Sequence, residues 1–121
     1  MSKPSSQAAT EHRKLLADSV ADFVERGTDL ARVRRLRGTS GEHDRAVWKQ
    51  MAELGWLGIL VPERYGGLGL GLAEAAIVAK GLARSLAPEP LTAAAVLAAT
   101  ALAASENETL KAEQLDRKSV V

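Results

Sequence analysis

The glycines of GGLGLG, at positions 66–71, are the residues most suggestive of chemistry in this chain. A G-x-G spacing lets a backbone approach the phosphates of a dinucleotide, but only between a buried strand and a helix, with an acidic residue about 20 positions later. Here the preceding segment, ILVPERY, is interrupted by Pro62, which has no backbone N–H to give to a sheet. The glycines therefore do not indicate a dinucleotide site.

Side chains that bind metals or act as nucleophiles are few. The chain has no cysteine, and its two histidines, His12 and His43, lack the paired spacing of a histidine metal site. It contains no G-x-x-x-x-G-K-[ST] phosphate loop, no serine elbow and no carboxylate pair that stands out from the solvated charges. The residues alone predict neither metal binding nor a catalytic centre.

The charged residues balance, with 16 Lys plus Arg against 15 Asp plus Glu and a net charge of +1. Such a balance provides no overall field that would attract nucleic acid, anionic lipid or acidic ligands. The cluster of Arg32, Arg34, Arg35 and Arg37 favours a solvated turn or short helix, with phosphate or nucleic-acid binding as the alternative. We expect no nucleic-acid partner. The polar N-terminus, without the apolar core of a signal peptide, favours a cytoplasmic location.

The elements expected to carry these residues are helices. Apolar residues of segment 10–26 recur at helical spacing, with Thr10 as the expected N-cap, and residues 1–9 are expected to be disordered. A second apolar stripe runs through segment 42–54 and includes Trp48, which we therefore assign to the core. Both segments are predicted to be helices with one buried face.

Glycines and Pro62 interrupt helical structure after Gly55, and regular structure is expected to resume near Leu72. The alanine-rich segment that follows is predicted to be a helix. Gly81 within it indicates a close contact with a neighbouring backbone. The two prolines of APEP end this helix, because each disfavours the α conformation in the residue before it.

The uncharged run LTAAAVLAATALAA, at 91–104, is too short and too weakly apolar to span a membrane, which takes roughly 20 residues. A helix that is apolar all round is expected to be buried on several sides. Ser105 and Glu108 then form a predicted capping box that opens a last helix towards Leu115. Without strand patterns or repeats, the sequence predicts a single all-α domain over 1–121, a helical bundle of about five or six helices.

The segment from LGWLGILVPERYGGLGLG to LARSLAPEPL closely resembles the N-terminal helical domain of acyl-CoA dehydrogenases. The resemblance combines VPERYGG at 61–67, the following helix, the LAP break and a later capped helix in one order, and it covers about 42–115. It implies a three-domain enzyme in which FAD lies between a middle β domain and a C-terminal helical bundle, neither of which is expected in this chain. In the implied reaction, the α,β-dehydrogenation of an acyl-CoA thioester, a glutamate of that bundle removes the Cα proton while hydride passes from Cβ to the flavin.

The same resemblance implies two roles for residues of this domain. The helix after APEP would form one wall of the acyl pocket, and the matching positions are Leu91, Ala94, Ala95 and Ala98. Three alanines favour a wide or long acyl group, although small residues equally permit tight helix packing. An apolar patch would receive a leucine of the electron-transfer flavoprotein, and its matching positions are Trp56, Leu68, Leu70 and Val78.

The glycine-rich segment has two interpretations. Apolar side chains on a loop that cannot bury much of itself would form a surface patch typical of a partner site. Alternatively, Trp56 and Ile59 plug the bundle while Tyr65 anchors the turn through its hydroxyl group. We favour the plug for Trp56 and Ile59 and leave the docking role of Leu68 and Leu70 open.

The predicted function is that of the N-terminal domain or a fragment of an FAD-dependent acyl-CoA dehydrogenase, which is not expected to be active alone. Its expected partners are the acyl-CoA substrate, the electron-transfer flavoprotein, and either further copies of the chain or the missing domains. The alternative is a stand-alone helical interaction module of the same fold without catalytic activity.

Overall fold

The computed structural model describes residues 6–27, 30–39 and 43–116, and all regular elements in these ranges are helical. In chain order they are α1 (Ser6–Gly27), α2 (Leu30–Arg37), α3 (Arg45–Glu53), η1 (Trp56–Gly58), η2 (Glu63–Tyr65), α4 (Leu72–Ala83), η3 (Thr92–Ala98), α5 (Ala99–Ala104) and α6 (Glu108–Asp116). The elements η1 and η2 are single 3₁₀ turns, and η3 is a π-helix. The prediction of an all-α fold is confirmed.

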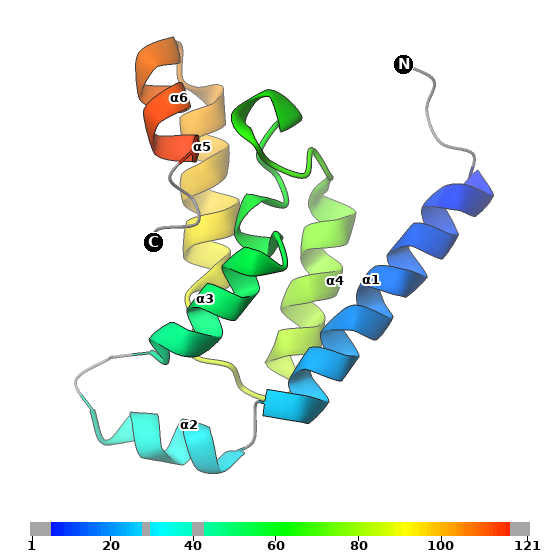
Figure 1. Ribbon diagram of the computed structural model, residues 1–121, viewed down its shortest axis with the longest axis vertical. Coiled ribbons are helices and arrows are strands. Elements are labelled where there is room, and N and C mark those ends of the chain that lie inside the picture. The colour runs from blue at the N-terminus through cyan, green and yellow to red at the C-terminus, as the bar shows by residue number, and fades with distance from the viewer. Residues whose placement is uncertain (1–5, 28–29, 40–42, 117–121) are drawn as a thin grey trace.

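The helices form a bundle with one element set apart (Figure 1). Helices α1 and α4 pack side by side, α3 leads into η1, and η1 packs on η3. Helix α6 folds back against α5 and also touches η2. Helix α2 lies at one end of the molecule, away from these packed pairs. In the part of the chain that the structure describes, every helix is too short or too polar to span a bilayer.

The core is built around the large apolar residues of α3, η1 and α4. Met51, Trp56, Ile59 and Val78 are almost completely buried, and Trp48 is only 4% exposed. The assignment of Trp48 to the core is confirmed. So is the interpretation of Trp56 and Ile59 as a plug, because both lie inside the bundle and Trp56 packs against other core residues.

The packing of α1 on α4 depends on Gly81. A Cβ atom at this position would overlap the side chain of Val20, which is itself 1% exposed. The predicted close contact is therefore present, but its partner is a side chain of α1 rather than a backbone. Glycine is required here because it lets the two helices approach each other.

Helix α1 begins earlier than the sequence suggested. It starts at Ser6, so Thr10 lies within the first turns and is not the N-cap. The hydroxyl of Thr10 instead donates to the Ser6 carbonyl at 2.9 Å, a bond within the helix. Residues 6–9 are consequently helical rather than disordered, and the remainder of that prediction, 1–5, lies outside the described residues.

The uncharged run is helical, but it is not buried on several sides. Ala95 and Ala99 face the interior, whereas Leu97 is 65% exposed. The expectation of burial on several sides is wrong because the described helices cover only one face of the run. The run also departs from the α-helix: the N–H of Ala99 donates to the carbonyl of Ala94, the spacing of a π-helix.

The last helix is capped by a different residue from the one predicted. The side chain of Asn107 accepts a hydrogen bond from the N–H of Leu110 at 3.0 Å, and α6 begins at the next residue, Glu108. The capping box of Ser105 and Glu108 is therefore wrong. Ser105 accepts a bond from the N–H of Asn107 at 3.1 Å, while the Glu108 carboxylate bonds elsewhere.

Candidate functional site

The glycine-rich segment is a compact loop that folds back on the residues just before it. The amides of Leu68, Gly69 and Leu70 donate to carbonyls of residues 58, 61 and 59, each at 2.9 Å. Gly67 passes so close to Val61 that any Cβ atom would overlap its carbonyl. Because these amides are used within the loop, they are not directed at a ligand. The segment is therefore a shaped connection, as its glycines require.

Tyr65 fixes this loop to the last helix. Its hydroxyl donates to Oε2 of Glu108 at 2.6 Å, and Nζ of Lys111 lies 3.3 Å from Oε1 of the same carboxylate. The hydrogen bond to Glu108 raises the pKa of Tyr65. The bond from Tyr65, followed by the contact with Lys111, lowers the pKa of Glu108. The predicted anchoring through the tyrosine hydroxyl is confirmed, and its acceptor lies on α6.

The four positions assigned to an acyl-pocket wall separate into two pairs. Leu91 and Ala95 are 7% and 1% exposed and belong to the core. Ala94 is half-buried and Ala98 exposed, and both line an apolar cavity of about 220 Å³. The cavity is bounded by residues of α3, η1, α5 and α6, among them Trp48, Leu57, Val61 and Leu115. The structure thus places two of the four residues at a cavity and two behind them.

The four positions assigned to a docking patch also separate. Trp56 and Val78 are 2% and 1% exposed and belong to the core cluster against which Leu70 packs. Leu68 is 41% exposed and Leu70 is half-buried. Leu68 lies against Gly55, at the end of α3.

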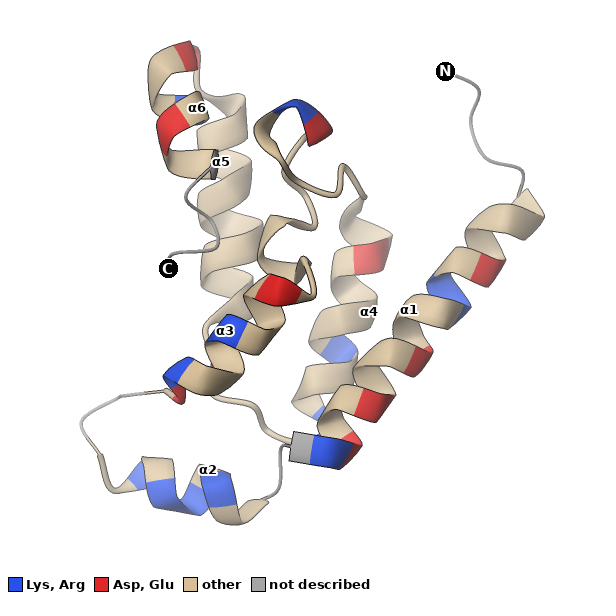
Figure 2. Ribbon diagram, in the orientation of Figure 1, with Lys and Arg blue, Asp and Glu red and all other residues tan. Residues whose placement is uncertain are grey.

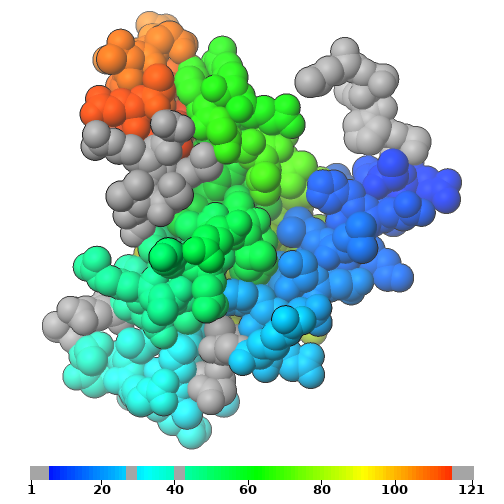
Figure 3. Space-filling model, in the orientation of Figure 1, coloured from blue at the N-terminus to red at the C-terminus, as the bar shows by residue number. Residues whose placement is uncertain are grey.

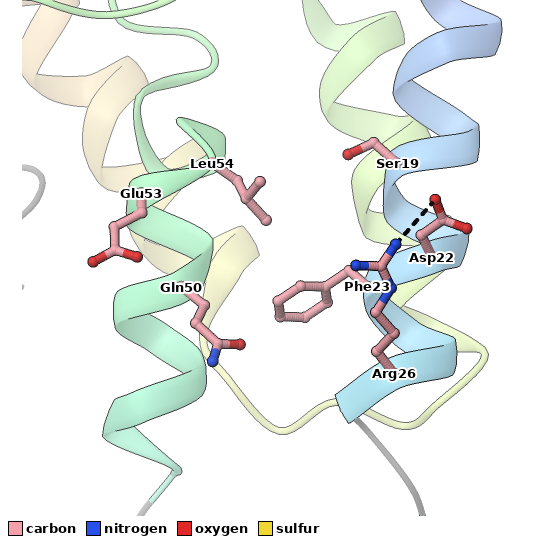
Figure 4. Close-up of a pocket in the computed structure, with 7 residues that line it drawn as sticks. All are labelled: Ser19, Asp22, Phe23, Arg26, Gln50, Glu53 and Leu54. Carbon is pink, nitrogen blue, oxygen red and sulfur yellow. Dashed lines mark ion pairs between the residues drawn. The ribbon is translucent and has the colours of Figure 1, made fainter.

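An open pocket of about 550 Å³ lies beside this surface, between α1 and α3 (Figure 4). Phe23 projects from α1 into the gap, and Gln50 and Leu54 face it from the other side. Phe23 also packs edge-on against Trp56, with ring centroids 5.0 Å apart and planes at 73°. Leu54 is 45% exposed. The sequence did not predict this pocket, because its walls come from two segments far apart in the chain. The spacing of apolar residues predicts one helix at a time and not how two helices lie together.

The pocket rim is charged. Arg26 lies along α1 with Nη2 3.8 Å from Oδ2 of Asp22, and both side chains are exposed. Glu53 of α3 also lines the pocket, but its carboxylate points away from the gap (Figure 4). The pocket therefore combines an aromatic floor with a polar rim, an arrangement suited to an apolar side chain on a polar partner surface. Among the described residues, no group of three or more His, Cys, Asp or Glu side chains is arranged to hold a metal ion.

The arginine cluster is divided by the fold. Arg34, Arg35 and Arg37 are exposed on α2, as expected for a solvated short helix (Figure 2). Arg32 is 4% exposed and pairs with Glu89, which is 6% exposed. Sequence reasoning did not anticipate this pair, since the two residues are 57 positions apart.

These features define a helical domain with an apolar cavity beside an alanine-rich helix and an open pocket beside a glycine-rich loop. The family described as "Acyl-CoA dehydrogenase, N-terminal domain" matches residues 10–118. The chain belongs to the acyl-CoA dehydrogenase family and forms its N-terminal domain.

Several relatives show how the chain compares in length. It is 31% identical over 112 residues to acyl-CoA dehydrogenase IpdE2 of Mycobacterium tuberculosis, covering 92% of this chain and 35% of the relative. It is 33% identical over 76 residues to a mitochondrial isovaleryl-CoA dehydrogenase of Pongo abelii, covering 63% of this chain and 18% of the relative. The chain thus spans about a third of the length of IpdE2. No solved structure matches it.

Proposed function

We propose that this domain acts within an FAD-dependent enzyme that removes hydrogen from Cα and Cβ of an acyl-CoA thioester. Membership of the family supports the reaction class. The observation that carries the proposed role of this chain is the apolar cavity beside Ala94 and Ala98, because an acyl chain requires an apolar wall without bulky side chains.

The glycine-rich loop does not fit a flavin site of its own. The glycine-rich loop uses its amides in bonds to carbonyls of the preceding segment 58–63, so it offers no cradle for a pyrophosphate. The flavin would supply the acceptor for hydride when bound, and we propose that other parts of the enzyme hold it. The contribution of this chain is to bind and shape the acyl group and to exclude water from it.

Within this role, Ala94 and Ala98 would contact the acyl chain, while Leu91 and Ala95 would hold their helix against the core. This helix, called the wall helix below, runs over 91–104 and includes η3 and α5. The burial of Leu91 and Ala95 supports this division. A methyl side chain leaves room that a larger residue would fill, so the wall favours a wide or long acyl group. The cavity of about 220 Å³ supplies part of that room.

We further propose that Leu68 and Leu70, supported by Trp56 and Val78, form a docking surface for the electron-transfer flavoprotein. The exposure of Leu68 and Leu54 and the neighbouring open pocket favour this surface. A partner leucine entering the pocket would meet the ring of Phe23. The assembly of further copies around the enzyme and its cytoplasmic location stay predictions.

Anaerobic titration of the native protein tests the proposed reaction. The flavin absorbance should decrease when acyl-CoA thioesters are added, and free coenzyme A or a free fatty acid should leave it unchanged. A native protein without flavin, or a flavin that no acyl-CoA reduces, would contradict the proposal.

A further inference from the structure

Helix α2 and the segment before the wall helix are joined by a buried ion pair. Nη1 of Arg32 donates to both oxygens of the Glu89 carboxylate, at 2.6 and 3.1 Å. Their side chains are 5% and 0% exposed. Removing one member of such a pair would leave the other charge in a poorly solvated site. The pair therefore holds two distant segments of the chain in a fixed relation.

Arg32 is a principal attachment of α2 to the bundle. Helix α2 lies at the edge of the molecule, at the lower left of the space-filling view (Figure 3). Leu30 is 49% exposed, and the other three arginines of the helix point to solvent. Val33 and Leu36 are only half-buried. With little other apolar burial, the position of α2 depends strongly on the bond to Glu89.

Glu89 lies in an irregular connection that leads directly to the wall helix. Leu86 adopts a left-handed conformation with φ of 52°, which is strained for a residue with a branched side chain. The N–H of Leu91 donates to the carbonyl of Glu89 at 2.8 Å, and the N–H of Ala94 donates to the carbonyl of Pro90 at 3.1 Å. The backbone of Glu89 is thus bonded to the first residue of the wall helix, and its side chain to α2.

We propose that the Arg32–Glu89 pair positions the N-terminal end of the wall helix and thereby determines which acyl groups fit beside Ala94 and Ala98. Arg32 and Glu89 are positioning residues in this scheme, since neither reaches the cavity. Because Glu89 is held from both sides, a change at Arg32 moves the start of the helix while the rest of the core stays in place. The part that concerns acyl groups rests on the proposed function.

Alanine-methyl NMR of the native protein tests the positioning directly. Arg32→Met should shift the methyl resonances of Ala94 and Ala95, and the matched control Arg35→Met, an exposed arginine of the same helix, should not. Equal spectra for the two variants would overturn the proposal. Arg32→Lys retains a cation that can donate to both carboxylate oxygens. The methyl resonances of this variant should therefore lie close to those of the native protein.

A second variant separates position from stability. Arg32→Met combined with Glu89→Leu replaces the pair by apolar side chains, which commonly preserves a fold that a single removal would damage. The proposal expects this double variant to unfold near the native temperature and still to show displaced methyl resonances. Recovery of the native resonances together with the native unfolding temperature would mean that apolar side chains place the wall helix equally well, and this result would overturn the proposal.

Selectivity is then measured as the ratio of kcat/KM for a long and a short acyl-CoA. We expect the ratio to change about tenfold in the double variant, which is the effect of adding or removing one methylene group in an apolar pocket. In Arg35→Met the ratio should equal that of the native enzyme. Displaced methyls with an unchanged ratio would overturn the role in selectivity. A native enzyme that oxidises no acyl-CoA while the methyls still move would instead refute the proposed function and retain the positioning.

Discussion

The hydroxyl of Tyr65 donates a hydrogen bond of 2.6 Å to the carboxylate of Glu108, joining the glycine-rich loop to α6. The tyrosine ring also lies beneath the guanidinium group of Arg64, 4.8 Å from its centroid. The loop is therefore attached in two ways. Its backbone bonds to residues 58–61, and the side chain of Tyr65 bonds to α6, which follows 43 positions later in the chain.

This bond makes stability depend on pH at both ends of the scale. The pKa of Glu108 is lowered by the bond from Tyr65, so the stabilisation is present above the ordinary value of 4.5 and is lost as pH falls through the lowered pKa. The pKa of Tyr65 is raised by the same bond, so the stabilisation is present below 10.0 and is lost as pH rises through the raised pKa.

Tyr65→Phe should remove the alkaline dependence and reduce the acidic one, because Lys111 still contacts the Glu108 carboxylate. We expect thermal unfolding of this variant to change less than that of the native protein between about pH 7 and about pH 3, the range in which carboxylates titrate. The measurement is the unfolding temperature of both proteins across that range. Parallel curves would contradict the assignment of the Glu108 shift to Tyr65.

Gly81→Ala should destabilise the domain by about 1–3 kcal/mol, because the new methyl group meets Val20 in a packed core. Gly38→Ala is the matched control, since an added Cβ there makes only an ordinary contact, and it should stay within about 0.5 kcal/mol of the native protein. Chemical denaturation measures both. The double variant Val20→Ala with Gly81→Ala should lose less unfolding free energy than the sum of the losses in the two single variants. A loss equal to that sum would show that the two residues are not in contact.

Ala98→Leu should lower kcat/KM for long acyl-CoA thioesters about tenfold relative to short ones, because a larger side chain would narrow the apolar cavity. The unfolding free energy should change by less than about 0.5 kcal/mol, since Ala98 is exposed. Ala93→Leu, on the same helix and outside the cavity lining, is the control. If both variants altered the preference equally, the cavity would not be part of the acyl pocket.

Leu68→Asp with Leu70→Asp should slow electron transfer to the electron-transfer flavoprotein by about tenfold or more, because the carboxylates would replace apolar contacts at the partner surface. Turnover with a small artificial acceptor should stay close to native. Leu72→Asp, at a leucine that is 68% exposed, provides the control for an added surface charge. Equal losses with both acceptors would refute the docking role.

The sequence predicts the helices well where apolar residues repeat within one helix. The apolar stripe of segment 42–54 predicts that Trp48 lies in the core, and the plug interpretation places Trp56 and Ile59 there; all three are buried. Gly81 was identified because glycine is rare in a helix without a reason. Each of these inferences uses only residues close together in the chain.

Relations between distant segments could not be predicted in this way. The pairing of Arg32 with Glu89 follows from how α2 and the APEP segment meet, which no local pattern records. The cap of α6 was missed because Glu108 bonds to Tyr65 rather than to its own helix end. The pocket beside Phe23 likewise arises only when α1 and α3 are brought together.

The π-helix of the wall has a consequence for insertions and deletions. Each residue of an α-helix turns the chain by about 100°, and a π-helix accommodates an additional residue without breaking the helix. Deleting one alanine from Thr92–Ala98 would let the segment rewind as an α-helix and turn Ala94 relative to Ala98. In a run in which four of the seven residues are alanine, the number of residues rather than their identity then decides which of them face the cavity.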